Sequence, residues 1–286
     1  MAKSKSSSLR AQWLGERLKK ARKDAGLTLR ETAEYLQLHE GTVSRFETAT
    51  YPVRKSYIKD LVDYYGVSDA REREALLQLC EDAWRKDWWD GQASDVERGF
   101  IDYTWLEARA ERICAFEPML IHGLLQTEAY ARAIIQFAES EELSDESLER
   151  LVTFRMLRQN VLNGSNPTRV TSILDPCGLN RQVGDRDVMR GQLSHLLELN
   201  QLNNVEILIL PADTGPHAGM SGPFTLFEMP DPYSDVAFVE SLVGQTYLED
   251  DLKVAAFHRA YAELKTVALN PNETNKVIKQ SLKDIE

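Results

Sequence analysis

The hydrophobic period of the chain changes once, at the segment Asn163-Gly164-Ser165-Asn166-Pro167. Residues of these types favour loops and end regular elements. Before this loop, apolar residues recur every three to four positions, which is the spacing of amphipathic helices. After it, short β-rich runs occur at 170–174, 205–210, 224–228 and 236–240, with helical patterns at 187–199 and 252–268. This order predicts an α+β protein whose first half is helical and whose second half contains a mostly antiparallel sheet.

Residues 1–85 are predicted to form an all-α domain of five helices. The apolar spacing places these helices at 10–24, 28–37, 40–48, 58–65 and 68–84. Gly26 is typical of the residue that follows a helix, and Thr28 with Glu31 forms the pattern of a capping box at the start of the next one. We expect a connector and helical segment over 86–166, with helices at 100–116, 127–138 and 144–162. An α+β domain is expected over 167–286.

The stretch from Gly26 to Thr48 has the pattern of a helix-turn-helix. Two short amphipathic helices are joined by a tight turn at 37–39, and a basic helix precedes them. The residues predicted to point inward are all apolar and lock the second helix across the first: Ala33, Leu36, Leu38, Val43 and Phe46. The outward face of the helix at 40–48 can then enter the major groove of DNA as a rigid body.

Side chains on that outward face suit the chemistry of base edges. Arg45 can donate two hydrogen bonds to guanine, and Thr42 can offer its methyl group to thymine or its hydroxyl to a base edge. Glu40 can accept from cytosine, or it can act against wrong sites by repelling phosphates. Gly41 and Ser44 lie on or near the same face. We therefore expect these five residues to form the base-reading surface.

A second group of residues suits contacts to the phosphate backbone, which position a protein on DNA without reading its sequence. Its members are Thr28, Arg30, His39, Arg54 and Lys55. The charge distribution agrees with this expectation, although the whole chain carries −11. Residues 1–60 hold 13 Lys and Arg against 7 Asp and Glu, a net +6, and the remainder carries −17. A basic head on an acidic body suits binding of double-stranded DNA by the head alone. The alternative is a small helical bundle with an uneven surface charge and no ligand.

The segment Thr42-Val43-Ser44-Arg45-Phe46-Glu47 resembles the third helix of XRE (Cro/C1-type) regulators, and the similarity extends over residues 14–66. It implies a sequence-specific transcriptional regulator, and it implies that Arg22 pairs with Glu47. Leu29 departs from the family pattern, because many members carry there a glutamine that contacts phosphate. Arg30 is the residue that can substitute for that contact.

The rest of the chain resembles the C-terminal domain of unknown function, Scr1-like, that many actinobacterial XRE regulators carry. The similar motifs are Glu117-Pro118-Met119, 123–127, 130–133, 215–224, Phe238-Val239-Glu240 and Tyr247-Leu248-Glu249. The resemblance implies a regulator linked to development or to antitoxin-like gene pairs, which works with a small partner protein.

Enzyme chemistry finds little support in the sequence. The five histidines are scattered, and no zinc-protease, nucleophile-elbow or phosphate-loop motif occurs, so we expect no catalysis, no metal and no cofactor. Cys177, His217 and Asp213 could be assembled into a nucleophilic triad only if the fold brought them together. Three cysteines without C-x-x-C spacing suit a reducing cytoplasm, and no apolar run is long enough to span a membrane. We expect a cytoplasmic protein, associated with the nucleoid when it is bound to DNA.

The acidic body is expected to serve assembly. One recognition helix reads only a few base pairs, so we expect a homodimer on a pseudo-palindromic operator. Trp88, Trp89, Trp105 and the apolar stretch 119–125 could anchor a small protein encoded nearby, or they could be core residues. The Gly- and Pro-rich segment 215–223 is either a recognition loop or a plain connection between strands. The alternative function is a ligand-sensing regulator whose C-terminal domain binds a small molecule.

Overall fold

The computed structural model describes residues 8–85, 87–89, 98–138, 144–231 and 233–285. The chain divides into two compact units. The N-terminal unit consists of residues 1–91 with the short segments 100–102 and 231–233. The C-terminal unit consists of residues 92–99, 103–230 and 234–286. Within the described ranges, no helix is long and apolar enough to cross a membrane.

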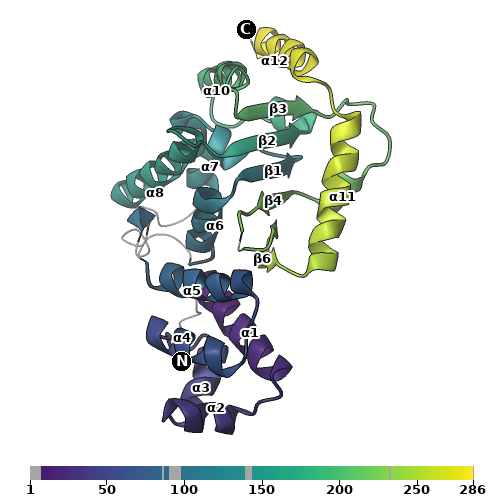
Figure 1. Cartoon of the computed structure of the whole chain (residues 1–286). Coiled ribbons are helices and arrows are strands. Elements are labelled where there is room, and N and C mark those ends of the chain that lie inside the picture. Colours follow the sequence, from purple (N-terminus) through teal and green to yellow (C-terminus); the bar gives the residue numbers. More distant parts are fainter. Residues whose placement is uncertain (1–7, 86, 90–97, 139–143, 232, 286) are drawn as a thin grey trace. The chain divides into compact units, whose positions relative to one another are not determined.

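The N-terminal unit contains the five expected helices (Figure 1). They are α1 (Leu9–Asp24), α2 (Leu29–Leu36), α3 (Glu40–Glu47), α4 (Lys55–Tyr64) and α5 (Ala70–Trp84). Their apolar faces meet in a core whose most buried members include Leu18, Ile58, Leu61, Leu76 and Leu79. The helices start where the sequence supplies caps. Ser8, Thr28 and Asp69 each accept a backbone N–H with their side chains.

Gly15 allows α1 to approach α3 closely. A Cβ atom at this position would lie 2.6 Å from the carbonyl oxygen of Glu47 and 2.9 Å from that of Phe46. No side chain fits at such a distance from a neighbouring backbone, so the absence of a side chain at Gly15 sets the spacing of the two helices. The sequence analysis did not single out this glycine.

The C-terminal unit is built on a mixed sheet with the strand order β3-β2-β1-β4-β5-β6. The strands are β1 (Arg112–Glu117), β2 (Arg169–Leu174), β3 (Val205–Ile209), β4 (Phe224–Glu228), β5 (Val236–Ser241) and β6 (Gly244–Leu248). The pairs β1·β2 and β2·β3 are parallel, and the pairs β1·β4, β4·β5 and β5·β6 are antiparallel. The expected α+β class is confirmed, and three of the five strand pairs are antiparallel.

Helices cover this sheet. They are α6 (Arg98–Arg109), α7 (Glu128–Ala138), α8 (Asp145–Arg158), α9 (Pro176–Asn180), α10 (Arg186–Leu199), α11 (Asp251–Val267) and α12 (Pro271–Ile285), with short 3₁₀ turns η2 (Gly123–Leu125), η3 (Gln159–Leu162) and η4 (Ala218–Ser221). Residues of α11, Tyr261 and Leu264 among them, pack on one face of the sheet against Phe116 and Leu226 (Figure 1). Side chains alternate along a strand. Thr225, next to Leu226, therefore faces the opposite side.

The expected helix over 100–116 is wrong in its second half. The helix ends at Arg109, and residues 112–117 form β1, which lies between β2 and β4 near the centre of the sheet. Residues 113–116 are buried on both faces of the sheet. In such a continuous apolar run the hydrophobic periodicity cannot distinguish a strand from a helix. The sequence analysis also lacked β6 and α12. Strands from both sides of position 166 thus belong to one sheet. The division into segments 1–85, 86–166 and 167–286 stays a prediction, which concerns which segments fold independently.

Candidate nucleic-acid interface

The turn between α2 and α3 is tight. Gln37 adopts a left-handed conformation with φ 57°, and the N–H of Leu38 donates to the carbonyl of Ala33 at 2.9 Å. His39 then begins α3, because its Nδ1 accepts the N–H of Gly41 at 3.2 Å. These local bonds hold α3 across α2 in the arrangement that the sequence predicted for residues 26–48.

The start of α2 is closed by the expected capping box. Thr28 Oγ1 accepts the N–H of Glu31 at 3.2 Å, and the N–H of Thr28 donates to the Glu31 carboxylate at 2.8 Å. The Thr28 hydroxyl also donates to the Glu31 carboxylate at 2.7 Å, and this bond, together with the one from the Thr28 N–H, lowers the pKa of Glu31. Arg30 donates to Glu34 at 2.9 Å in an exposed pair, which is weak enough to open in favour of a phosphate. The hydroxyl and the N–H of Thr28 are therefore both engaged with Glu31 within the cap.

Arg45 is exposed on α3, where it is held by its own helix. Its Nε donates to the carbonyl of Gly41 at 3.0 Å, and its Nη2 donates to the Thr42 hydroxyl at 3.3 Å. The guanidinium also lies 5.7 Å from the ring centre of Tyr51, a cation–π distance. The structure therefore brings together Arg45, Thr42 and Gly41, while Val43 points into the core.

The remaining expected contacts lie on different elements. Glu40 is exposed at the start of α3, and Ser44 is half-buried. Arg54 is the exposed residue that precedes α4, and Lys55 forms an ion pair with Glu81 of α5. Sequence reasoning missed Tyr51, although an exposed aromatic residue shortly after a basic helix position was a signal that could have found it.

A buried ion pair holds α3 from behind. Arg22 of α1 donates from Nε and Nη2 to the two carboxylate oxygens of Glu47, at 2.5 and 2.9 Å. Its Nη1 also donates to the carbonyl of Leu27 at 2.7 Å. The hydrogen bonds to Glu47 raise the pKa of Arg22. Since both side chains are over nine-tenths buried, the pair fixes the end of α3 rigidly to α1.

Comparison with protein-family models gives two matches. A helix-turn-helix domain matches residues 13–76. A domain of unknown function, DUF5753, matches residues 100–280, which is more than half of the chain. The chain belongs to the DUF5753 family. No curated protein and no solved structure matches it. The helix-turn-helix domain makes this member of the DUF5753 family a DNA-binding regulator, in agreement with the resemblance found in the sequence.

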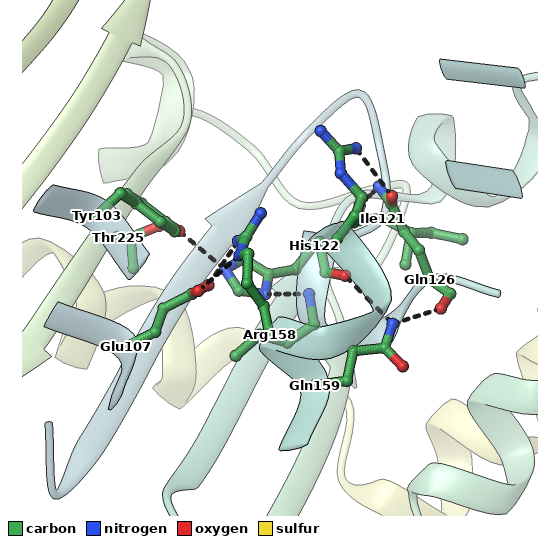
Figure 2. Close-up of polar contacts among 11 residues, drawn as sticks. Tyr103, Glu107, Ile121, His122, Gln126, Arg158, Gln159 and Thr225 are labelled. Atoms are coloured by element: carbon green, nitrogen blue, oxygen red, sulfur yellow. Dashed lines mark hydrogen bonds and ion pairs between the residues drawn. The ribbon is translucent and has the colours of Figure 1, made fainter. Parts of the chain in front are cut away.

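The DUF5753 domain contains a buried polar network that the sequence analysis missed (Figure 2). Arg158, the last residue of α8, donates to both carboxylate oxygens of Glu107 on α6 at 2.6 and 2.7 Å. The guanidinium lies 5.3 Å from the ring centre of Tyr103, which adds a cation–π contact. Both members of the ion pair are almost fully buried. Each charge therefore depends on the other, because burial without a partner is costly.

His122 extends this network to the sheet. Its Nδ1 accepts the N–H of Leu124 at 3.3 Å, so the neutral ring carries its proton on Nε2. The Nε2–H then donates to the Tyr103 hydroxyl at 3.1 Å, and that hydroxyl shares a hydrogen bond of 3.4 Å with the Thr225 hydroxyl of β4 (Figure 2). Burial lowers the pKa of His122 to about 3, which keeps the ring neutral. The network thus links α6, β4 and the loop before α7.

Three glutamine side chains fix that loop, and the first, Gln126, donates to the carbonyl of Ile121 at 2.7 Å. Gln159 donates to the carbonyl of Gln126 at 2.6 Å (Figure 2). Gln192 of α10 donates to the carbonyl of Leu125 at 2.7 Å and accepts the N–H of Thr127 at 2.7 Å. Gln126 and Gln192 are almost fully buried. The amides satisfy backbone groups that no helix or strand pairs, so this loop of the DUF5753 domain has one defined conformation.

The DUF5753 domain does not assemble the triad considered from the sequence. Cys177 is exposed near the start of α9, and the adjacent Asp175 raises its thiol pKa, which opposes formation of a thiolate. His217 accepts the N–H of Gly219 at 3.1 Å. No contact joins Cys177, His217 and Asp213 in the described parts of the chain. Within those parts, no group of three or more His, Cys, Asp or Glu residues is placed to hold a metal ion.

Proposed function

We propose that the chain is a sequence-specific transcriptional regulator of the XRE type that reads the major groove with α3. Arg45 carries the proposal. It is exposed, it is steadied by Gly41, Thr42 and Tyr51, and its fork of N–H groups matches the acceptors of guanine. The pair behind α3 keeps this surface in place.

Arg30, His39 and Arg54 are exposed around the reading helix, where they suit phosphate contacts. We include Thr28 because it caps α2 and so places the start of this helix, although its hydroxyl and its N–H are both engaged with Glu31. Lys55 contributes once its ion pair with Glu81 opens, and Glu40 and Ser44 complete the reading face.

The experiment is a gel shift with the full chain on the DNA upstream of its own gene, repeated at several salt concentrations. Arg45→Ala is expected to weaken specific binding by about 1–3 kcal/mol and to relax the preference at one base pair. Arg71→Ala, which removes an exposed arginine from the first turn of α5, is the matched control and leaves affinity nearly unchanged. Equal affinity of Arg45→Ala and wild type, with melting temperatures also equal, would show that α3 does not read DNA.

The DUF5753 domain is proposed to mediate dimerisation on a pseudo-palindromic operator and to bind a small protein encoded nearby. Of the anchors considered from the sequence, Trp89 and Trp105 are buried and serve the core. The tip of the β5–β6 hairpin supplies better ones, because Leu242 and Val243 are fully exposed. Exposed apolar side chains at a hairpin tip favour a protein partner over solvent. We place this activity in the cytoplasm, at the nucleoid.

A Leu242→Ser/Val243→Ser double variant tests the assembly proposal by light scattering of the full chain, free and on DNA. Loss of the dimer or of a co-purifying small protein supports it, with Leu202→Ser, an exposed leucine after α10, as the control. A wild-type chain that is monomeric in both conditions contradicts dimerisation.

Binding of a small ligand by the DUF5753 domain is the second candidate function. The buried network around Arg158 favours it, because so many polar side chains are seldom buried together unless they also take part in binding or catalysis.

A further inference from the structure

The face of the sheet opposite α11 is lined by polar groups at one end. Phe116 and Leu226 pack toward α11, so the alternate residues Glu117 and Thr225 face the other side. Thr225 is paired with Phe238 in the β4–β5 register, and Glu240 therefore lies on this same face. The network of Arg158 and His122 reaches this face through the Tyr103 hydroxyl.

Arg155 is the one arginine of this network without a carboxylate partner. It lies on the inward stripe of α8, in line with the buried Leu148 and Val152, and it is itself half-buried. Its Nη1 donates to Gln126 Oε1 at 3.1 Å. In the part of the chain that the structure describes, no Asp or Glu lies within ion-pair distance of this guanidinium. Among the described residues, four of its five N–H groups have no hydrogen-bond acceptor, so they are open to water or a ligand.

The groups around Arg155 leave its charge uncompensated. Arg158 and Glu107 neutralise one another, and His122 is neutral. Glu240 attracts Arg155, but it is exposed, and water screens that attraction. Burial and the neighbouring Arg158 together lower the pKa of Arg155 to about 10, so desolvation outweighs the attraction of the carboxylates. Such a site attracts anions.

The guanidinium is also held in a fixed direction. Its partner Gln126 is almost fully buried, and the Gln126 amide is itself fixed by donating to the carbonyl of Ile121 at 2.7 Å (Figure 2). A donor held in this way loses little conformational freedom when it binds a ligand, which strengthens binding.

We propose that Arg155 binds the oxyanion of a small metabolite, a carboxylate or a phosphate, in a bidentate contact, and that Gln126 orients the guanidinium for it. The inference deepens the ligand-binding function proposed for the DUF5753 domain. It is independent of DNA binding, because the site lies wholly within residues of the C-terminal unit.

The test measures thermal unfolding of the full chain while sodium phosphate or sodium acetate replaces sodium chloride at constant ionic strength. Wild type is expected to show a saturable rise in Tm with phosphate, with acetate, or with both, and the effective anion identifies the ligand chemistry. Arg155→Gln is expected to weaken the apparent affinity about tenfold or more, as loss of a charge-assisted bidentate contact requires. Arg150→Gln, on the same helix and paired with Glu146, is expected to respond like wild type.

General salt effects raise Tm without saturation and act on all three proteins equally, so they are separated from site binding. If neither anion gives a saturable rise in wild type, or if Arg155→Gln keeps the full response, the inference is overturned. Should Arg155→Gln fail to fold, Arg155→Lys replaces it, since lysine keeps the charge and loses the planar fork. If wild type shows the saturable rise in Tm but no gel shift, the anion site is supported and only the DNA-binding proposal is contradicted.

Discussion

In its described residues, each unit of the molecule contains a buried arginine–glutamate pair of the same bidentate form. Arg22–Glu47 joins α1 to α3 in the helix-turn-helix domain, and Arg158–Glu107 joins α8 to α6 in the DUF5753 domain. The side chains of the first pair are 9% and 5% exposed, and those of the second are 3% and 0% exposed. The first pair borders solvent and closes a small bundle, whereas the second is enclosed by a larger core.

The surroundings of the two pairs separate their roles. Arg22 has Glu47 and one carbonyl as partners, which is sufficient to hold a reading helix. Arg158 also contacts the Tyr103 ring, and Tyr103 carries hydrogen bonds onward to His122 and the sheet. Burial raises the pKa of Glu107, which shows that desolvation acts strongly on this carboxylate. The first pair is therefore a local clamp, and the second is the centre of a network.

Removing a carboxylate from the network is expected to give the largest effect. Glu107→Ala removes the carboxylate that balances the buried charge of Arg158, which should cost about 3–5 kcal/mol in the free energy of unfolding. Urea denaturation of the full chain, followed by far-UV circular dichroism, measures it. Arg132→Ala is the control, because Arg132 pairs with Glu149 at the surface, where solvent screens the ion pair and its loss changes stability little. Equal midpoints for Glu107→Ala and the control would show that the pair is not critical.

Glu47→Ala is expected to have a smaller effect on stability and an additional effect on DNA. Arg22 keeps its bond to the Leu27 carbonyl and lies nearer to water, so we expect a loss of about 2–3 kcal/mol, at or below the lower end for buried pairs. Since α3 loses its link to α1, affinity in the gel shift should fall as well. A thermal melt and gel shift that both match wild type would exclude a clamp.

The contrast between the pairs also explains what the sequence could predict. The five N-terminal helices follow from local signals, such as the Thr28–Glu31 capping box and short amphipathic periods. The pair Arg22–Glu47 came from family resemblance. Glu107 and Arg158 are 51 positions apart in segments with no motif of their own, and only the tertiary fold makes them neighbours. A charged residue on an otherwise apolar helix stripe was the one local signal.

The strands show the same division. β2 to β5 were predicted, because β-branched runs there are bounded by Pro, Gly, Asp and Asn. β1 was missed because its apolar run is buried on both faces, and β6 because an edge strand with the sequence Gly244–Leu248 alternates only weakly. Two parts of the candidate interface could be predicted from the sequence, namely the turn between α2 and α3 and the place of Arg45 on the outward face of α3. The steadying contact with Tyr51 depends on how the loop after α3 folds.

Glu117 sharpens the comparison, because it is a half-buried carboxyl with no arginine partner among the described residues. Burial, and then the nearby Glu240, raise its pKa to about 8. In the unfolded chain the pKa is near the ordinary value of about 4.3, so the folded protein binds the extra proton between these values. The stability contributed by that proton is complete below about pH 4 and is lost as pH rises through 8. Wild type should therefore lose stability progressively as pH rises from about 4 to about 8.

Glu117→Gln removes that titration and keeps the shape of the side chain. We expect the variant to match wild type near pH 4, to gain on it as pH rises, and to exceed it by about 1–2 kcal/mol at pH 8 and above, a value discounted for partial exposure. Urea midpoints measured from pH 4 to pH 9 check the slope. Glu111→Gln, on the same stretch of chain, is the control and should leave the profile unchanged. Parallel profiles for Glu117→Gln and wild type would show that Glu117 ionises normally. A half-buried carboxyl of this domain could then carry a charge without an arginine partner, whereas the fully buried Glu107 carries its charge next to Arg158.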